Sequence, residues 1–112
     1  MVNREIRLQA TFMALADPAR RAVVAQLARG EASISSLAAE HEMSLPGFLK
    51  HIRVLEEAGL VSTRKEGRVR TCRLEAGALA DAEDWLARHR MFWQRQLDSL
   101  ERFLKTTDPK ES

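Results

Sequence analysis

The cationic side chains of residues 44–74 are the part of the sequence with the clearest chemistry. This segment holds seven lysines and arginines against three acids, a balance of +4, although the whole chain carries only +2. The remaining residues therefore sum to −2. Such a local excess of lysine and arginine attracts phosphate groups, so the segment favours a polyanionic partner such as a nucleic acid.

Other kinds of chemistry lack the residues that they need. A single cysteine, Cys72, excludes an internal disulfide and any site that takes two thiolates from one chain. The chain has no glycine-rich phosphate loop and no nucleophile beside a plausible base, so we expect no catalysis, cofactor or metal. The longest apolar run is five residues, and no signal peptide is visible. We therefore expect a cytoplasmic protein with no membrane partner.

Two helices are expected before the cationic segment. Apolar residues at helical spacing predict the first helix over about residues 4–16. Asp17 can cap a second helix that begins at Pro18, where the missing N–H of proline costs nothing. This helix is predicted to run to Arg29 and to stop at Gly30.

Two shorter helices follow, joined by a tight connection. We expect Ser35 to cap the third helix, which ends near His41 or Glu42. Ser44 is expected to cap the fourth helix, over residues 44–58, and Gly59 to stop it. Short helices joined in this way form a helix-turn-helix unit, of which the second helix is the cationic one.

The pattern changes after residue 59 to alternating polar and apolar residues, which predicts a β-hairpin over residues 61–74 around a Glu66-Gly67 turn. Helical periodicity returns over about residues 78–104. The resulting fold class is mainly α with a small β-hairpin, a winged helix-turn-helix in the order α-α-α-α-β-β-α. We expect a single domain over residues 1–104 and a flexible polar tail over residues 105–112.

The fourth helix should bury one face and leave the other free. At 100° per residue, one side carries the apolar residues Leu45, Phe48, Ile52 and Leu55. The opposite side carries Pro46, Lys50, Arg53 and Glu57, flanked by Gly47 and Leu49. A helix that enters the major groove meets base edges with its N-terminal residues. The alternative is an ordinary solvated face. Leu49 either touches thymine methyl groups or leans into the core.

The hairpin favours DNA over that alternative, because its tip is basic and directly follows a cationic helix. A β-ribbon of this charge can hold the phosphate backbone or the minor groove. His51 can either support the helix or contact phosphate. The candidate DNA-binding residues are Ser44, Pro46, Gly47, Lys50, His51, Arg53, Arg64, Lys65, Arg68 and Arg70.

Three motifs carry a resemblance to a known family. They are "ALADPARRAVVAQLARGEASISSLAAEHEMS", "LPGFLKHIRVLEEAGLV" and "RKEGRVRTCRLE". In their order and spacing the chain resembles the ArsR-type (ArsR/SmtB-like) winged-helix repressors over about residues 5–104. The resemblance implies a homodimeric repressor of a double-stranded DNA operator with paired half-sites. It also implies dimerisation through the first and last helices.

The last helix supports dimerisation independently, because both tryptophans and two of the four phenylalanines lie in it. Buried aromatic residues often anchor interfaces, although ordinary packing within one chain is the alternative. The candidate interface residues are Ile6, Leu8, Phe12, Trp85, Leu86, Phe92, Trp93, Leu97 and Leu100.

The chain departs from the family at the usual metal sites. Ser36, Leu37 and Ala38 occupy the region where paired cysteines would lie. His89, in the last helix, has no coordinating neighbour three or four residues away, so we interpret it as a packing or hydrogen-bonding residue. His41, between two glutamates, is interpreted as a surface residue. No effector is visible.

Cys72 leaves one further hypothesis open. A lone cysteine in a strand is usually a small packed residue, but its neighbours Arg70 and Arg73 could lower the pKa of its thiol and make it sensitive to oxidation. Two alternative functions therefore stand beside DNA binding. One is a winged helix used as a protein-interaction module, and the other is a metal or redox sensor with a site shared between subunits.

Overall fold

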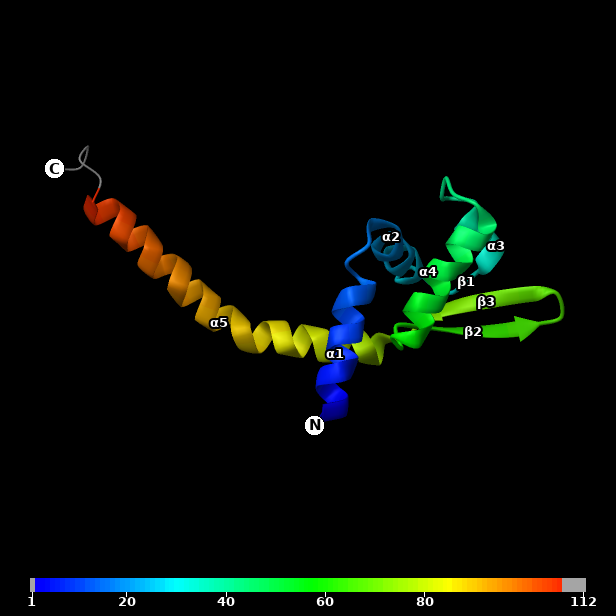
Figure 1. The fold of residues 1–112 in the computed structure, drawn as a ribbon, viewed down its shortest axis with the longest axis horizontal. Helices are drawn as coiled ribbons and strands as arrows, with labels where there is room; N and C mark the ends of the chain where they lie inside the picture. Colours follow the sequence, from blue (N-terminus) through cyan, green and yellow to red (C-terminus); the bar gives the residue numbers. More distant parts are fainter. Residues whose placement is uncertain (1, 108–112) are drawn as a thin grey trace. The chain divides into compact units, whose positions relative to one another are not determined.

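The computed structural model describes residues 2–107 of the chain, which form five helices and three strands (Figure 1). In chain order they are α1 (Val2–Ala14), α2 (Pro18–Leu27), β1 (Ala32–Ser33), α3 (Ile34–Ala38), α4 (Leu45–Glu57), β2 (Val61–Glu66), β3 (Val69–Leu74) and α5 (Ala76–Thr107). This order confirms the predicted mainly helical winged helix-turn-helix class and adds one short strand. The chain divides into two compact units, residues 1–82 and residues 83–112.

Side-chain caps begin three of the helices. The Asp17 carboxylate accepts a hydrogen bond from the Arg20 N–H at 3.1 Å, and Pro18 is the first residue of α2, as predicted. The prediction for α3 was wrong by two residues, because Ser33 rather than Ser35 accepts the bond from the Ser36 N–H. Each cap satisfies an N–H group that the first turn of a helix leaves without a partner.

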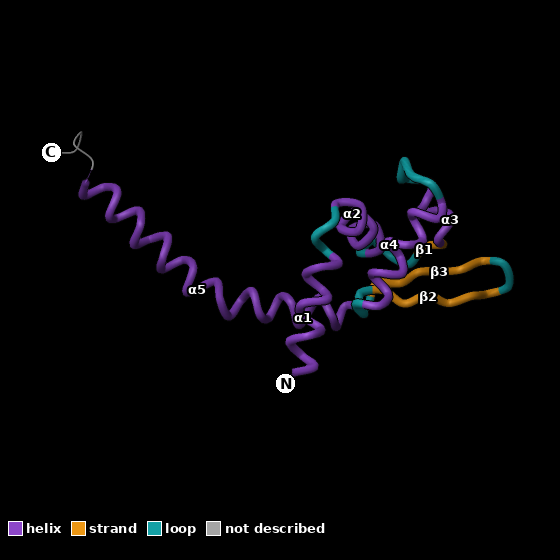
Figure 2. The backbone as a smooth tube through the Cα atoms, in the orientation of Figure 1, coloured by secondary structure: helices purple, strands orange, loops and turns teal. Residues whose placement is uncertain are grey.

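The sheet has three antiparallel strands in the order β1-β3-β2 (Figure 2). Strand β1 was not predicted, and it pairs Ala32 with Cys72. Strands β2 and β3 pair from Val61 opposite Leu74 to Glu66 opposite Val69. The connecting turn is therefore Gly67-Arg68, one residue later than predicted. Gly67 has a φ of 63°, which suits the first central position of a type II′ hairpin turn.

The core of the first unit lies between helices α1–α4 and the sheet. Helix α4 contributes three side chains that are at most 2% exposed, namely Phe48, Ile52 and Leu55. Leu45 was predicted on the same buried face, but it is 55% exposed and that prediction was wrong. The fully or almost fully buried apolar residues of this core are Ala14, Val23, Leu27, Ile34, Leu37, Phe48, Ile52, Leu55, Leu60, Val61 and Cys72.

His41 is a further correction, because it is half-buried rather than a surface residue. Its Nε2 lies 2.9 Å from the Gln26 side-chain oxygen, and its ring centre lies 5.2 Å from that of Phe48. His41 therefore covers the buried phenylalanine of α4 and connects it to α2.

The helix ends differ from the predicted ones by a few residues. Helix α1 ends at Ala14 and α2 ends at Leu27, each two residues before its predicted end. Helix α5 continues to Thr107, so the first three residues of the predicted tail are helical and residues 108–112 lie outside the described part. None of the described helices is long and apolar enough to cross a bilayer.

Candidate nucleic-acid interface

The start of α4 is built by Ser44 and Gly47. The Ser44 hydroxyl oxygen accepts a hydrogen bond from the Gly47 N–H at 3.2 Å. A Cβ atom on residue 47 would also lie 3.2 Å from that oxygen, a tight contact that the Ser44 side chain would have to relieve by a small shift. The hydroxyl proton of Ser44 has no acceptor among the described residues, so it remains available to a phosphate oxygen.

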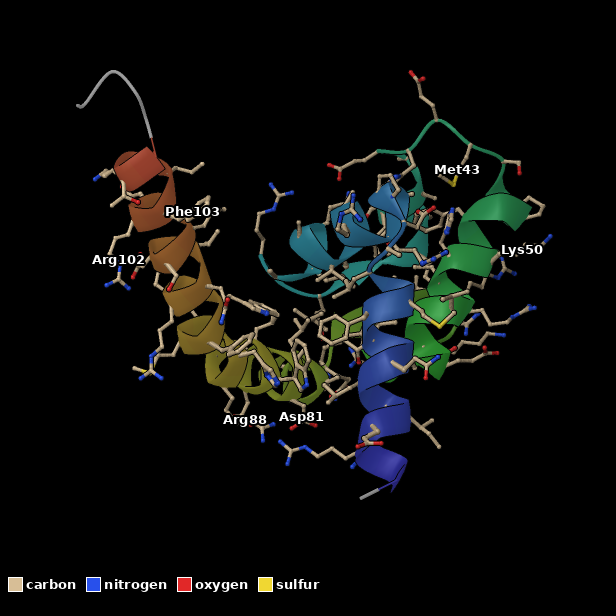
Figure 3. All side chains as sticks on the ribbon, turned by 60° about the vertical axis from the view of Figure 1, so that its left-hand side comes forward. Met43, Lys50, Asp81, Arg88, Arg102 and Phe103 are labelled. Carbon is tan, nitrogen blue, oxygen red and sulfur yellow. The ribbon has the colours of Figure 1, made fainter. Side chains whose placement is uncertain are left out.

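The predicted free face of α4 is exposed. Pro46, Lys50 and Arg53 are all exposed, and Figure 3 shows the Lys50 side chain projecting outward from the helix. Neither Lys50 nor Arg53 forms an ion pair within residues 2–107. The two cations of this face therefore have no acidic partner that a phosphate would have to displace.

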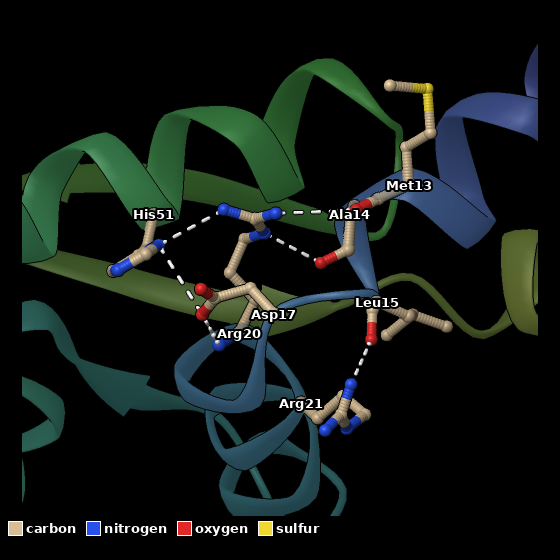
Figure 4. A network of polar contacts seen from close by, with 7 residues as sticks. All are labelled: Met13, Ala14, Leu15, Asp17, Arg20, Arg21 and His51. Carbon is tan, nitrogen blue, oxygen red and sulfur yellow. Dashed lines mark hydrogen bonds and ion pairs between the residues drawn. The ribbon is translucent and has the colours of Figure 1, made fainter.

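His51 belongs to a network that holds α4 against the junction of α1 and α2 (Figure 4). The Arg20 guanidinium donates to the Ala14 carbonyl at 2.6 Å and lies 3.3 Å from the His51 Nδ1. Asp17 lies 3.9 Å from the same nitrogen, and the bond from the Arg20 N–H lowers the pKa of this carboxyl below its usual value.

The network supports one of the two roles open to His51, the attachment of the helix. Since a guanidinium only donates, the Arg20 contact is a hydrogen bond in the tautomer whose Nδ1 accepts and whose Nε2 carries the proton. In Figure 4 the Nε2 points away from the network. The Nδ1 contact therefore helps to hold α4, and the Nε2 takes no part in the network drawn.

The hairpin of β2 and β3, which we call the wing, carries two kinds of cation. Arg64 donates to Glu66 at 2.6 Å and to Glu31 at 3.2 Å, and these carboxylates, Glu31 first, raise the pKa of its guanidinium. Lys65 and Arg68 are exposed and form no ion pair within the described chain. Half of the predicted wing cations are thus free at the tip.

Glu56 of α4 connects the helix to the wing. Its carboxylate accepts a hydrogen bond from the Thr63 hydroxyl at 2.8 Å and lies 3.7 Å from the Arg70 guanidinium. Arg70 and Arg53 both line a hollow of about 130 Å³ between α4 and β3. Sequence reasoning missed Glu56 and Arg20, because each acts through partners that are distant in the chain.

The chain is similar to known helix-turn-helix transcriptional regulators. A family model described as a helix-turn-helix domain matches residues 15–64. The HTH-type transcriptional regulator Rv2034 of Mycobacterium tuberculosis is 38% identical over 86 residues, which cover 77% of this chain and 78% of that protein. The solved structure of the ArsR family transcriptional regulator RHA00566 superposes with a TM-score of 0.75 at 47% identity, covering 80% of this chain and 93% of that one.

The chain belongs to the ArsR-type winged helix-turn-helix regulators. Transcriptional repressor SdpR of Bacillus subtilis is a further relative, 27% identical over 75 residues, which cover 67% of this chain and 83% of that protein. Members of this family are DNA-binding transcriptional regulators and not enzymes, which agrees with the prediction. The cationic helix α4 and the wing are the candidate nucleic-acid interface of this ArsR-type regulator.

Exposed apolar side chains lie on α1 and α5 of this ArsR-type regulator. On α1, Ile6 is 59% exposed and Phe12 is 37% exposed, while Leu8 is half-buried. On α5, Trp85 is half-buried and five of the predicted interface residues are 41–60% exposed. These five are Leu86, Phe92, Trp93, Leu97 and Leu100.

His89 packs between the two tryptophans of α5. Its ring stacks on Trp85 with centres 4.1 Å apart and lies 6.1 Å from Trp93, and its Nδ1 lies 2.7 Å from the Trp85 carbonyl oxygen. This confirms the interpretation of His89 as a packing and hydrogen-bonding residue. Within residues 2–107, no three His, Cys, Asp or Glu side chains gather as a metal-binding group.

Proposed function

We propose that this ArsR-type regulator is a homodimeric repressor that binds a pseudo-palindromic operator. In each subunit α4 enters the major groove and the wing, residues 61–74, lies on the adjacent backbone. The observation that carries this proposal is the pair of cations on the outer face of α4 and the cations at the wing tip, which form no ion pair with any residue that the structure describes. The printed name of the relative SdpR supports repression.

Each site residue has a proposed role. Lys50 and Arg53 contact base edges, because they lie on the exposed face of the helix that enters the groove. Pro46 and Gly47 allow a close approach at its start. Ser44 and the Nε2 of His51 donate to phosphate. In the wing, Lys65 and Arg68 bind the backbone directly, while Arg64 and Arg70 do so only in competition with their carboxylate partners.

The exposed apolar side chains of α1 and α5 support the proposed dimerisation. Side chains of this size exposed along a helix mark a surface that a partner covers. We propose that a second copy of the chain covers them, because a two-fold dimer presents two identical α4 helices to a palindromic site. Residues 1–104 then act as one DNA-binding and dimerisation domain.

Selection from a random DNA pool tests the proposal directly. We expect enriched sequences with two inverted half-sites whose centres are about 34 Å apart, one turn of the duplex. Parallel selections with zinc and with an oxidant test the sensor alternatives, and we expect the same sequences in all three. Enrichment of asymmetric sites, or of no sequence at all at low salt, would contradict the proposed function.

A further inference from the structure

A groove of about 400 Å³ runs between the start of α3, the start of α4 and the start of β3. Two large apolar side chains at its lining are open to solvent, Leu45 at 55% and Val69 at 52% exposed. Leu49 closes the groove from α4 and itself packs against the core. The lining residues are Ser33, Ile34, Ser35, Leu45, Leu49, Arg68, Val69 and Arg70.

Cationic side chains lie beside the two exposed apolar residues, Leu45 and Val69. Arg68 and Arg70 line the same groove as Leu45 and Val69. The lining thus combines two guanidinium groups, which are complementary in charge to a phosphate backbone, with the apolar side chains of Leu45, Leu49 and Val69. A partner that fits both must be a polyanion that also presents an apolar group.

Duplex DNA has one such group in the major groove. Every base edge there offers hydrogen-bond donors or acceptors, and only thymine adds a methyl group, at C5. Leu45 is the first residue of α4, and the N-terminal residues of a helix in the major groove are those that reach base edges. Leu45 is therefore placed where a thymine methyl would be encountered.

We propose that Leu45, Leu49 and Val69 form a subsite for the 5-methyl group of one thymine in each operator half-site. The proposal rests on the proposed function, since it deepens the contact between α4 and the major groove. Arg68 and Arg70 hold the strand by its phosphates while the apolar side chains cover the methyl group. The subsite reads one thymine without any hydrogen bond.

Replacement of thymine by deoxyuridine tests the subsite, because it removes only the methyl group. Each thymine of the selected operator is replaced in turn, in both half-sites, and the Kd is measured by fluorescence anisotropy. At one thymine position we expect the Kd of the wild-type protein to rise about fourfold for each half-site replaced. This factor is the contribution of one buried methyl carbon to the binding affinity. With Leu45→Ala, or with Val69→Thr, the same replacement should change the Kd by less than about 1.5-fold.

Lys65→Ala is the matched control, since Lys65 lies on the wing outside the groove. This variant should bind every operator more weakly and keep the full deoxyuridine penalty. Two variants on different elements keep the test valid if one fails to fold, which a thermal melt followed by circular dichroism detects. Loss of the penalty in either folded variant supports the subsite.

Three results would overturn the proposal while leaving the proposed function intact. They are an operator without thymine in the α4 half-sites, a wild-type protein insensitive to every replacement, and a penalty that survives unchanged in both variants. A wild-type protein that binds no selected sequence would instead contradict the proposed function, and the subsite with it.

Discussion

Cys72 lies in β3, the central strand of the sheet, and its side chain is fully buried. Burial raises the pKa of its thiol to about 11, and the negative charge of Glu56 acts in the same direction. Arg70 opposes both effects but is outweighed. The neighbouring arginines therefore do not activate the thiol as their place in the sequence suggested, and the structure argues against oxidation sensing by this residue.

The raised pKa of Cys72 predicts a loss of stability at alkaline pH. Below pH 9 the thiol is neutral in both states and its contribution is fully present; between about pH 9 and 11 only the unfolded chain ionises. We expect the free energy of unfolding to fall by about 1 to 2 kcal/mol across this window. Urea titrations at several pH values measure it, and the absence of tyrosine leaves few other groups that titrate there.

Cys72→Ala provides the control for this titration. The variant loses some stability at every pH because a buried atom is removed, but it should lose the cysteine-dependent part of the alkaline slope. An identical slope in both proteins would mean that Cys72 does not titrate as its burial indicates.

Arg20 and Arg21 are neighbours with different roles in the structure. The Arg20 guanidinium donates to the carbonyls of Ala14 and Met13 and contacts His51, whereas the Arg21 guanidinium donates to the Leu15 carbonyl at 2.8 Å. We expect Arg20→Met to lower the free energy of unfolding by about 1 to 2 kcal/mol, and Arg21→Met by about 0.5 kcal/mol or less. Chemical denaturation compares them, and equal losses would rule out the network as the attachment of α4.

At the scale of elements, the wing separates free from paired cations. Each phosphate contact adds about 0.9 to the slope of log K against log salt, so a dimer that neutralises six to eight phosphates should show a slope near −5 to −7. Arg68→Ala should flatten this slope by about two, one contact per subunit, and weaken all DNA sequences to a similar extent. Binding titrations at several salt concentrations measure both effects.

Arg64→Ala is the matched comparison, because Glu31 and Glu66 already pair with this guanidinium. Its removal should flatten the salt slope less than removal of Arg68. A larger effect from Arg64 would show that the ion pairs open on DNA and that the wing changes its contacts when it binds.

The elements also show what sequence reasoning can reach. The caps at Asp17 and Ser44, the hairpin and the buried side of α4 all follow from local patterns, and all are present. Strand β1 was not predicted, because two residues are too short to show the alternating pattern of a strand. They form a strand only by pairing with β3, about 40 residues later in the chain. That pairing ends at Ser33, which leaves this serine rather than Ser35 to begin α3.

The candidate site could also be predicted from the sequence only in part. Helical spacing identified the exposed cations of α4, but it also assigned Leu45 to the core, although this first residue of the helix is 55% exposed. The ion pairs of Arg64 and Arg70 could not be predicted, since Glu31 and Glu56 reach them only through the tertiary fold. The lysines and arginines of the sequence indicate that a surface is positively charged. They do not indicate which of these cations form ion pairs.

At the scale of the whole molecule, α5 offers a matched test of the dimer. Leu100 and Met91 are 53% and 66% exposed and lie nine residues apart, which places them on opposite sides of the helix. We expect Leu100→Arg to weaken dimerisation by a hundredfold or more, about 3 kcal/mol for a charge buried in an apolar interface, and to weaken operator binding with it. Sedimentation equilibrium measures the dimer, and Met91→Arg should leave it unchanged.

The two variants carry the same new charge on the same helix, so a general effect of charge cannot separate them. Dissociation of both would indicate that α5 as a whole has lost its structure, which circular dichroism would reveal. Dimers in both would exclude the predicted side of α5 as the interface.

The contacts of Glu56 with Thr63 and Arg70 have a consequence for the target sequence. Because the Glu56 carboxylate of α4 contacts Thr63 of β2 and Arg70 of β3, we expect it to limit changes in the spacing of the helix and the ribbon on the duplex. A base pair inserted between the stretch read by the helix and the stretch gripped by the ribbon should therefore be tolerated poorly, even where every individual base is unchanged.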